Sequence, residues 1–278
     1  MKERQLQHII QSHPATDGAG VKIQRVAMFD QPLTDPFLML DEFQSETESD
    51  YIAGFPSHPH RGMETLSYLL HGSLEHQDHL GNKGIIHSGG AQWMSAGRGI
   101  IHSEMPAREL DKLHGFQLWI NLAAAEKMQA PDYRDVEADE IPELAFKGAE
   151  IRAIAGHWQI EDNQIEGPLN KLSAETSILD IRLEAGANLK INTKAHQRVL
   201  AKLYDGQLST KPLAPEKSVL VFSEGDELVL STENGASLLL LSGTPIKEKV
   251  VHYGPFVMNS YEEIEQAIAD YNSGSFGE

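Results

Sequence analysis

Two short segments of the chain place metal-ligating side chains two residues apart. His58 and His60 flank Pro59 in the first segment, and His102 stands two residues before Glu104 in the second. Residues i and i+2 of an extended strand point to the same face, so each pair can converge on one ion. The two pairs together offer three imidazole nitrogens and one carboxylate oxygen, a set that suits Fe(II), Mn, Ni, Cu or Zn better than Ca or Mg. Because the chain has 13 histidines, either pair taken alone could equally be structural or exposed.

A further carboxylate, Glu64, follows His60 by four residues. If the strand continues through this stretch, Glu64 lies on the same face as the imidazole. It is then a fifth ligand, a general base or a group that orients a ligand imidazole, and we favour the last two roles. The plain alternative is an exposed strand glutamate. The remaining histidines, His76 among them, lack a partnered spacing and are interpreted as structural or surface residues, with a reservation for His114, which could lie near the same strands.

The segments that would position these residues have the character of short strands. Bulky or alternating runs occur at 37–40, 65–70 and 116–120, and glycine-bearing turns punctuate the chain. Further runs of this kind lie in the second half, at 178–183, 199–204, 219–222 and 228–230. Closely spaced short strands joined by glycine turns favour an antiparallel barrel or sandwich.

Two stretches are predicted to be helical. One is the alanine-rich segment 123–129, which ends before Pro131. The other begins at Ser260, with Glu263 three residues later in the pattern of a capping box. An acidic stretch with two prolines, residues 130–148, separates the two β-rich halves. We therefore predict an all-β protein of two tandem domains.

The composition excludes several classes of function. Acidic residues number 41 and basic residues 23, a net charge of −18 without any basic run, which disfavours binding to nucleic acid or to an anionic membrane. The absence of cysteine excludes disulfides, thiolate nucleophiles, iron–sulfur clusters and cysteine-type zinc sites. The N-terminal residues lack the apolar stretch of a secretory signal, and the longest aliphatic run is Leu238–Leu241. We expect a cytoplasmic protein.

Around the two ligand pairs, the sequence resembles the pirin family of the cupin superfamily. Residues 54–65, GFPSHPHRGMET, resemble its first metal-binding segment, and residues 92–106, QWMSAGRGIIHSEMP, resemble the second. The resemblance extends to four further segments, 35–38, 41–43, 254–259 and 262–264. It therefore covers nearly the whole chain.

The resemblance implies two tandem cupin β-barrels of the jelly-roll type with a short C-terminal helix. Residues 1–135 would form a metal-binding barrel, and residues 136–245 a degenerate barrel without metal. Residues 246–278 would form a segment whose helix packs back on the first barrel. In the second half, the segment 194–198 stands where a metal-binding segment would begin, but it retains only His196. One imidazole is a poor metal site, so we predict that this barrel holds no metal and is structural.

The resemblance also implies one iron-like ion bound by His58, His60, His102 and Glu104. Manganese, nickel, copper, cobalt and zinc are alternatives for the same ligand set. Cupin sites often use the carboxylate at the position of Glu64 instead, but here the second ligand pair favours Glu104.

Within the pirin family the attested activity is oxygen-dependent cleavage of quercetin, a 2,3-dioxygenase reaction. The resemblance therefore implies a flavonol-like aromatic substrate and O₂, with Glu64 as a possible acceptor of the substrate's hydroxyl proton. The alternative is a non-enzymatic regulatory protein whose metal or redox state controls binding to a transcription factor or a metabolic enzyme. The lack of a basic run resembling a nuclear localisation signal disfavours the nuclear version of that alternative.

Overall fold

The computed structural model divides the chain into two compact units. It describes residues 2–29, 31–107 and 111–278. The unit that we call the first barrel consists of His13–Gln31, Phe37–Ala138 and Ile246–Glu278. The unit that we call the second barrel consists of Met1–Ser12, Pro32–Pro36 and Asp139–Pro245.

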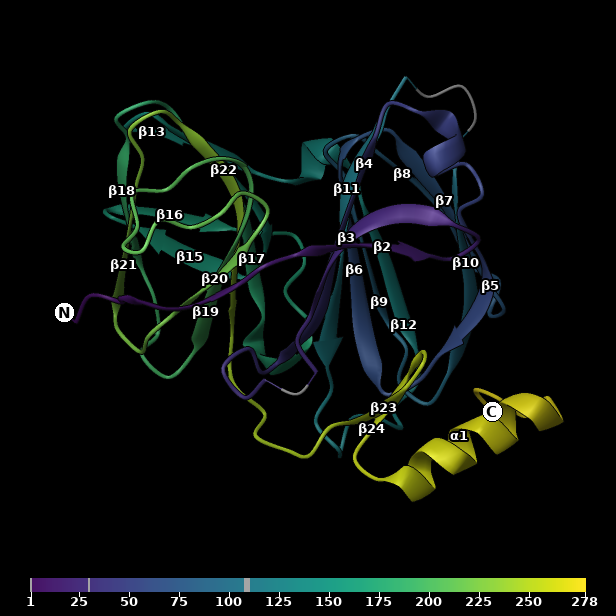
Figure 1. The fold of residues 1–278 in the computed structure, drawn as a ribbon. Helices are drawn as coiled ribbons and strands as arrows, with labels where there is room; N and C mark the ends of the chain where they lie inside the picture. Colours follow the sequence, from purple (N-terminus) through teal and green to yellow (C-terminus); the bar gives the residue numbers. More distant parts are fainter. Residues whose placement is uncertain (1, 30, 108–110) are drawn as a thin grey trace. The chain divides into compact units, whose positions relative to one another are not determined.

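The first barrel is built from two antiparallel sheets, a hairpin and a helix (Figure 1). Its seven-stranded sheet has the order β12-β9-β6-β11-β4-β3-β2 and its four-stranded sheet the order β5-β10-β7-β8. The strands of the larger sheet are β2 (His13–Asp17), β3 (Val21–Ala27), β4 (Phe37–Ser45), β6 (Met63–His71), β9 (Ala91–Ser95), β11 (Leu113–Asn121) and β12 (Asp132–Val136). Those of the smaller sheet are β5 (Phe55–His60), β7 (Ser73–Asp78), β8 (Lys83–His87) and β10 (Ile100–Pro106). The hairpin and helix are β23 (Val251–Tyr253), β24 (Phe256–Met258) and α1 (Tyr261–Ser273).

The second barrel repeats this combination of a large and a small antiparallel sheet (Figure 1). The orders are β1-β20-β19-β22-β17-β14-β13 and β16-β15-β18-β21. The larger sheet contains β1 (Leu6–Ile10), β13 (Glu143–Phe146), β14 (Ala149–Ala155), β17 (Ser177–Leu183), β19 (Arg198–Gly206), β20 (Val219–Phe222) and β22 (Ala236–Gly243). The smaller contains β15 (His157–Ile160), β16 (Asn163–Glu166), β18 (Asn188–Asn192) and β21 (Glu227–Ser231). Short 3-10 turns lie at Glu48–Asp50, Ala138–Glu140 and Ser173–Glu175. The predicted all-β fold of two tandem cupin barrels is confirmed.

Alternation along the strands decides which side chains face the barrel interior. On β10, residues 100, 102, 104 and 106 are buried and the intervening residues are partly exposed. This period of two places His102 and Glu104 on one face. In the second barrel, the inward positions of β18 and β21 belong to one large apolar cluster.

The N-terminal strand departs from the predicted domain division. We expected residues 1–135 to form one unit, but β1 pairs antiparallel with β20 of the second barrel. This pairing joins residues more than two hundred positions apart in the sequence and satisfies the backbone hydrogen-bonding groups along one edge of β20. No local pattern in the first ten residues indicates it.

Of the two predicted helices, the C-terminal one is confirmed and the other is wrong. Helix α1 begins after Ser260, whose side chain accepts a hydrogen bond from the backbone N–H of Glu263 in a complete capping box. Within this stretch, residues 124–128 instead form successive turns. Seven residues are too few to form a stable helix by propensity alone, and Lys127 is fully buried, its amine held by oxygens outside this segment. Among the described residues, no helix combines the length and the apolar character needed to cross a bilayer.

Candidate metal centre

Three of the four predicted ligands converge in the first barrel. Strands β5 and β10 are paired so that His58 lies opposite His102. The Nε2 atom of His58 is 3.0 Å from Nε2 of His60 and 3.0 Å from Nε2 of His102. The ligand atoms of all three lie within 4.8 Å of one another, and no other such histidine and carboxylate group of three or more occurs among the residues that the structure describes.

Backbone carbonyls fix the orientation of two of these rings. The Nδ1 atom of His58 is 2.8 Å from the carbonyl oxygen of Pro56, and Nδ1 of His60 is 3.3 Å from that of Pro255. A carbonyl oxygen only accepts hydrogen bonds, so each Nδ1 carries a proton and Nε2 is the nitrogen of each ring that can bind an ion. The two Nε2 atoms are 3.0 Å apart, close enough for one cation to contact both.

Burial keeps two of the imidazoles neutral. His60 and His102 are 2% and 1% exposed. Loss of solvation, followed by the proximity of His58, lowers the pKa of His60 well below its usual value, and burial with the neighbouring imidazoles does the same for His102. Neutral imidazole is the form that binds a metal.

The spacing of the nitrogens fits a transition-metal ion. Metal–imidazole bonds are about 2.1 Å long, so two nitrogens bound at a right angle lie about 3.0 Å apart. Both measured Nε2 separations from His58 are 3.0 Å. The three imidazoles are therefore spaced as neighbouring ligands of one ion.

Glu104 lies on β10 next to this group but outside it. Its side chain is buried, and its carboxylate accepts a hydrogen bond of 2.8 Å from the Ser67 hydroxyl. The Gln117 amide donates a second hydrogen bond of 3.4 Å to the other oxygen. Glu104 borders the same cavity as His58 and His60. These two donors hold the carboxylate in the cavity wall.

Glu64 does not share a face with His60, and the premise of a continuous strand is wrong. Strand β5 ends at His60, and β6 begins at Met63. Between them Gly62 adopts a φ of +79°, where an added Cβ would lie 2.1 Å from the carbonyl oxygen of Val257, so the chain turns at a position that requires glycine. Glu64 is three residues before Ser67, which contacts Glu104, and therefore faces the opposite side of β6. It is buried, and it does not border the cavity.

His76 is a residue of the site that we had interpreted as structural or exposed. Strand β7 pairs with β10, and Nδ1 of His76 lies 3.3 Å from Nδ1 of His102. On its other side, Nε2 of His76 is 3.5 Å from Asp78, and its ring stacks on Tyr133 with 4.4 Å between centroids. If His102 donates its Nδ1 proton to His76, its Nε2 is free to bind an ion. The signal in the sequence was the i, i+2 spacing of His76 and Asp78, the same spacing that marked the ligand pairs.

Two other histidines lie away from this group. His114 is buried on β11, with Nε2 3.1 Å from the carboxylate of Glu42, and does not border the cavity. His196 is exposed on the loop between β18 and β19. The absence of metal from the second barrel stays a prediction.

A cavity of about 650 Å³ adjoins the three histidines. The rings of Phe29 and Trp119 meet edge to face with 6.1 Å between their centroids. The Trp119 ring also meets the His60 ring edge to face, with 5.1 Å between centroids. The polar corner of the cavity holds Arg25, whose guanidinium binds the carboxylates of Asp17 and Asp41. Its volume and aromatic walls are those of a site for a small flat molecule.

Comparison with known proteins places this arrangement in a family. The model of the family described as Pirin matches residues 20–120, and that of the Pirin C-terminal cupin domain matches residues 178–277. A Vibrio cholerae protein named "Putative quercetin 2,3-dioxygenase" is 47% identical over 277 residues, which cover 99% of this chain and 98% of that protein. A Pseudomonas aeruginosa protein of the same name is 45% identical, with 94% of each chain covered. The crystal structure of a quercetin 2,3-dioxygenase from Acinetobacter baumannii is similar with a TM-score of 0.89 at 31% identity, with 99% of each chain covered. The chain belongs to the pirin family.

Proposed function

We propose that this protein is a metal-dependent dioxygenase that cleaves quercetin or a related flavonol with O₂. One observation carries the proposal: three imidazole Nε2 atoms converge beside a cavity with aromatic walls. The names of two similar relatives, from Vibrio cholerae and Pseudomonas aeruginosa, support the same activity.

His58, His60 and His102 are the proposed ligands, with Glu104 as the fourth. The proposed ion is Fe(II), and Mn, Ni, Cu, Co or Zn would suit the same donors. When bound, such an ion supplies Lewis acidity toward a flavonol oxygen and, for the redox-active metals, one-electron chemistry with O₂. The hydrogen bonds from Ser67 and Gln117 would keep the Glu104 carboxylate directed at the cavity.

The residues of the cavity have three tasks in this proposal. Trp119 and Phe29 would bind the aromatic rings of the flavonol through their ring edges and exclude water from the reacting atoms. Glu104 would accept the substrate's hydroxyl proton, because Asp17 and Asp41, the other two cavity carboxylates, are bound by Arg25. Glu64, on the opposite face of β6 and outside the cavity lining, would not touch substrate.

Oxygen consumption with quercetin tests the proposal. The protein is loaded separately with iron, manganese, nickel and copper, its metal content is measured, and uptake is compared with that of His58→Ala and Glu104→Gln. Metal-dependent uptake that is lost in His58→Ala and reduced in Glu104→Gln is the expected result. Absence of uptake by protein that demonstrably contains metal would contradict the proposal and favour a regulatory role for the metal.

A further inference from the structure

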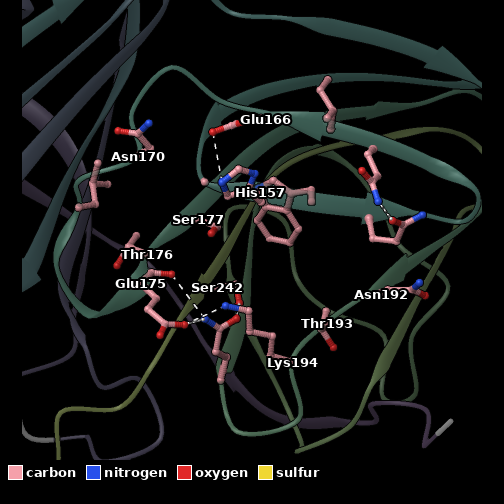
Figure 2. A pocket seen from close by; sticks show the side chains of 17 residues that line it. His157, Glu166, Asn170, Glu175, Thr176, Ser177, Asn192, Thr193, Lys194 and Ser242 are labelled. Atoms are coloured by element: carbon pink, nitrogen blue, oxygen red, sulfur yellow. Dashed lines mark hydrogen bonds and ion pairs between the residues drawn. The ribbon is translucent and has the colours of Figure 1, made fainter.

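The second barrel contains a cavity that the metal centre does not use. Its volume is about 830 Å³, within the range of about 300 to 1,000 Å³ typical of small-molecule sites. The β15–β16 hairpin borders one part of it, and the segment that follows β18 borders another. Figure 2 shows His157 and Glu166 of the hairpin across the cavity from Asn192, Thr193 and Lys194.

The charged side chains around this cavity are paired with one another. Lys194 Nζ lies 2.9 Å from a carboxylate oxygen of Glu175, and His157 Nε2 lies 3.2 Å from one of Glu166 (Figure 2). All four side chains are exposed, so both pairs lie at the rim. Among the described residues of the lining, no group of three or more histidines and carboxylates could hold a metal. Each lysine and carboxylate of the lining therefore already contacts another ionisable side chain, and the described lining offers no site for an ion.

The deeper wall is polar and buried. Gln197, Ser242 and Thr176 border the cavity and are 4%, 2% and 3% exposed. The Ser242 hydroxyl donates a hydrogen bond of 2.8 Å to the Gln197 amide oxygen, which fixes the amide orientation. The Thr176 hydroxyl has no hydrogen-bond partner. Because this hydroxyl is buried, the polar groups of the deeper wall that can face a ligand are those of Gln197 and Ser242.

Neutral side chains that both donate and accept hydrogen bonds also border the cavity. Asn170 and Asn192 present amides, and Ser177 presents a hydroxyl. Amides and hydroxyls match the hydroxyls of a sugar, each of which also donates and accepts. Trp158 and Leu172 supply apolar surface, which matches the C–H face of a sugar ring.

The wall is held in place before any ligand arrives. Arg4 donates to the Thr193 hydroxyl at 2.7 Å and to the carbonyl oxygens of Lys194 and Gln197 at 2.8 and 3.0 Å. At the rim, Ala174 and Glu175 both adopt left-handed backbone conformations, with φ of 55° and 49°. Non-glycine residues in this region are strained, and such residues concentrate at ligand sites. A preformed wall lowers the entropic cost of binding.

From this combination of volume, paired charges, buried hydroxyls and amides, we propose that the second barrel binds an uncharged saccharide of one or two sugar units. The binding site is independent of the metal centre and of the proposed dioxygenase reaction.

Calorimetric titration of the full-length, metal-loaded protein tests this proposal. The probes are glucose, maltose and cellobiose, with glucose 6-phosphate and glucuronate as charged counterparts. We expect saturable binding of a neutral sugar to one site, about tenfold weaker in Asn192→Ala, as for the loss of one or two hydrogen bonds. The matched control is Asn188→Ala, at an exposed position of the same strand outside the lining, which should bind as the wild type does. His58→Ala, which alters the other cavity, should also bind normally.

Three results would overturn the proposal: no binding of any neutral sugar, tighter binding of the charged sugars, or equal binding by Asn192→Ala and the wild type. If Asn192→Ala does not fold, Ser177→Ala, at another lining residue, carries the same expectation. Loss of binding in His58→Ala with retention in Asn192→Ala would assign the sugar to the metal cavity instead.

Discussion

The corresponding central strand pairs of the two barrels carry different inward side chains. In the first barrel, β5 and β10 place His58 opposite His102, and both imidazoles face a cavity. In the second, β18 and β21 place Leu189 opposite Leu230, and both side chains are part of the apolar core. The inward positions of the second pair therefore carry aliphatic side chains where the first pair carries imidazoles. The ligand chemistry therefore depends on a few inward residues and not on the barrel itself.

The small sheets differ in where their extra hairpin is attached. In the first barrel, β7 and β8 extend the sheet beyond β10, which brings His76 to within 3.3 Å of His102. In the second, β15 and β16 extend it beyond β18, the other strand of the central pair, and border the polar cavity. The hairpin thus places His76 beside His102 in the first barrel and borders a polar cavity in the second.

The largest expected effect separates the barrels by metal content. His60→Ala removes one of the three converging nitrogens, and we expect metal affinity to fall roughly a hundredfold or more. His196→Ala, at an exposed loop position of the second barrel, should leave metal content unchanged. Elemental analysis after dialysis measures both. Unchanged metal in His60→Ala would refute the ligand assignment, and loss of a second equivalent in His196→Ala would show that the second barrel also binds metal.

A buried lysine in each barrel allows a second comparison. The Nζ atom of Lys127 lies 2.7, 2.8 and 3.0 Å from oxygens of Gly62, Asn121 and Val257, and so ties the turn after His60 to β24. Lys127→Met leaves these buried acceptors without that donor, and we expect unfolding to become easier by about 3 kcal/mol and metal binding to weaken. Lys202→Met, in the second barrel, should leave metal affinity unchanged. Equal effects of the two variants on metal affinity would show that Lys127 supports the metal centre no more than Lys202 of the second barrel does.

The pH dependence of stability provides an independent check on Lys127. Burial lowers the pKa of Lys127 from 10.5 to about 7. Between these values the unfolded chain holds a proton that the folded protein lacks, so this lysine makes the free energy of unfolding rise with pH, by up to about 1.4 kcal/mol per pH unit. Lys127→Met should lose this rise. Denaturant unfolding of the metal-free proteins across that window measures it, and parallel curves for the two proteins would contradict the expectation.

The partner of His102 gives a smaller effect. His76→Phe retains an aromatic ring to stack on Tyr133 but removes the nitrogen that faces His102. We expect metal affinity to fall about tenfold, the lower end of what a lost orienting partner costs. A competition titration with a chelator measures this change, with His87→Phe at an exposed position of β8 as the control. If His76→Phe binds metal as tightly as the wild type, the β7–β8 hairpin does not contribute to the difference between the barrels.

Local patterns were sufficient for the features that depend on local geometry. The i, i+2 spacing of His58 and His60 needs only an extended strand to place both imidazoles together, and the cap of Ser260 needs only one helical turn. The fold of two tandem barrels was predicted from long motifs that resemble those of the pirin family. The three histidines converge because these local rules hold on both β5 and β10.

Features that depend on breaks or on distant pairing could not be predicted this way. Glu64 lies on the opposite face from the one predicted because Gly62 turns the chain. The spacing alone cannot distinguish a turn from a continued strand. His76 joined the site only because β7 pairs with β10. The strand Leu6–Ile10 pairs with β20, more than two hundred residues away, and no pattern in its sequence indicates that partner.

The smallest effect concerns helix α1 of the first barrel. The Ser260 hydroxyl accepts the backbone N–H of Glu263, and the Glu263 carboxylate accepts that of Ser260 in return. Ser260→Ala removes the first of these bonds and should lower the free energy of unfolding by about 1 kcal/mol. Toward the other end of α1, Asp270 binds Arg61 at 2.7 Å, and Arg61 follows His60 in the sequence. If the helix positions the metal centre through this ion pair, loss of the cap should weaken metal binding. We expect no such weakening, because loss of the Ser260 cap frays only the first turn of α1. Metal affinity within about twofold of the wild type, measured by the same chelator competition, would restrict the helix to a stabilising role, whereas a larger loss would add α1 to the elements that distinguish the two barrels.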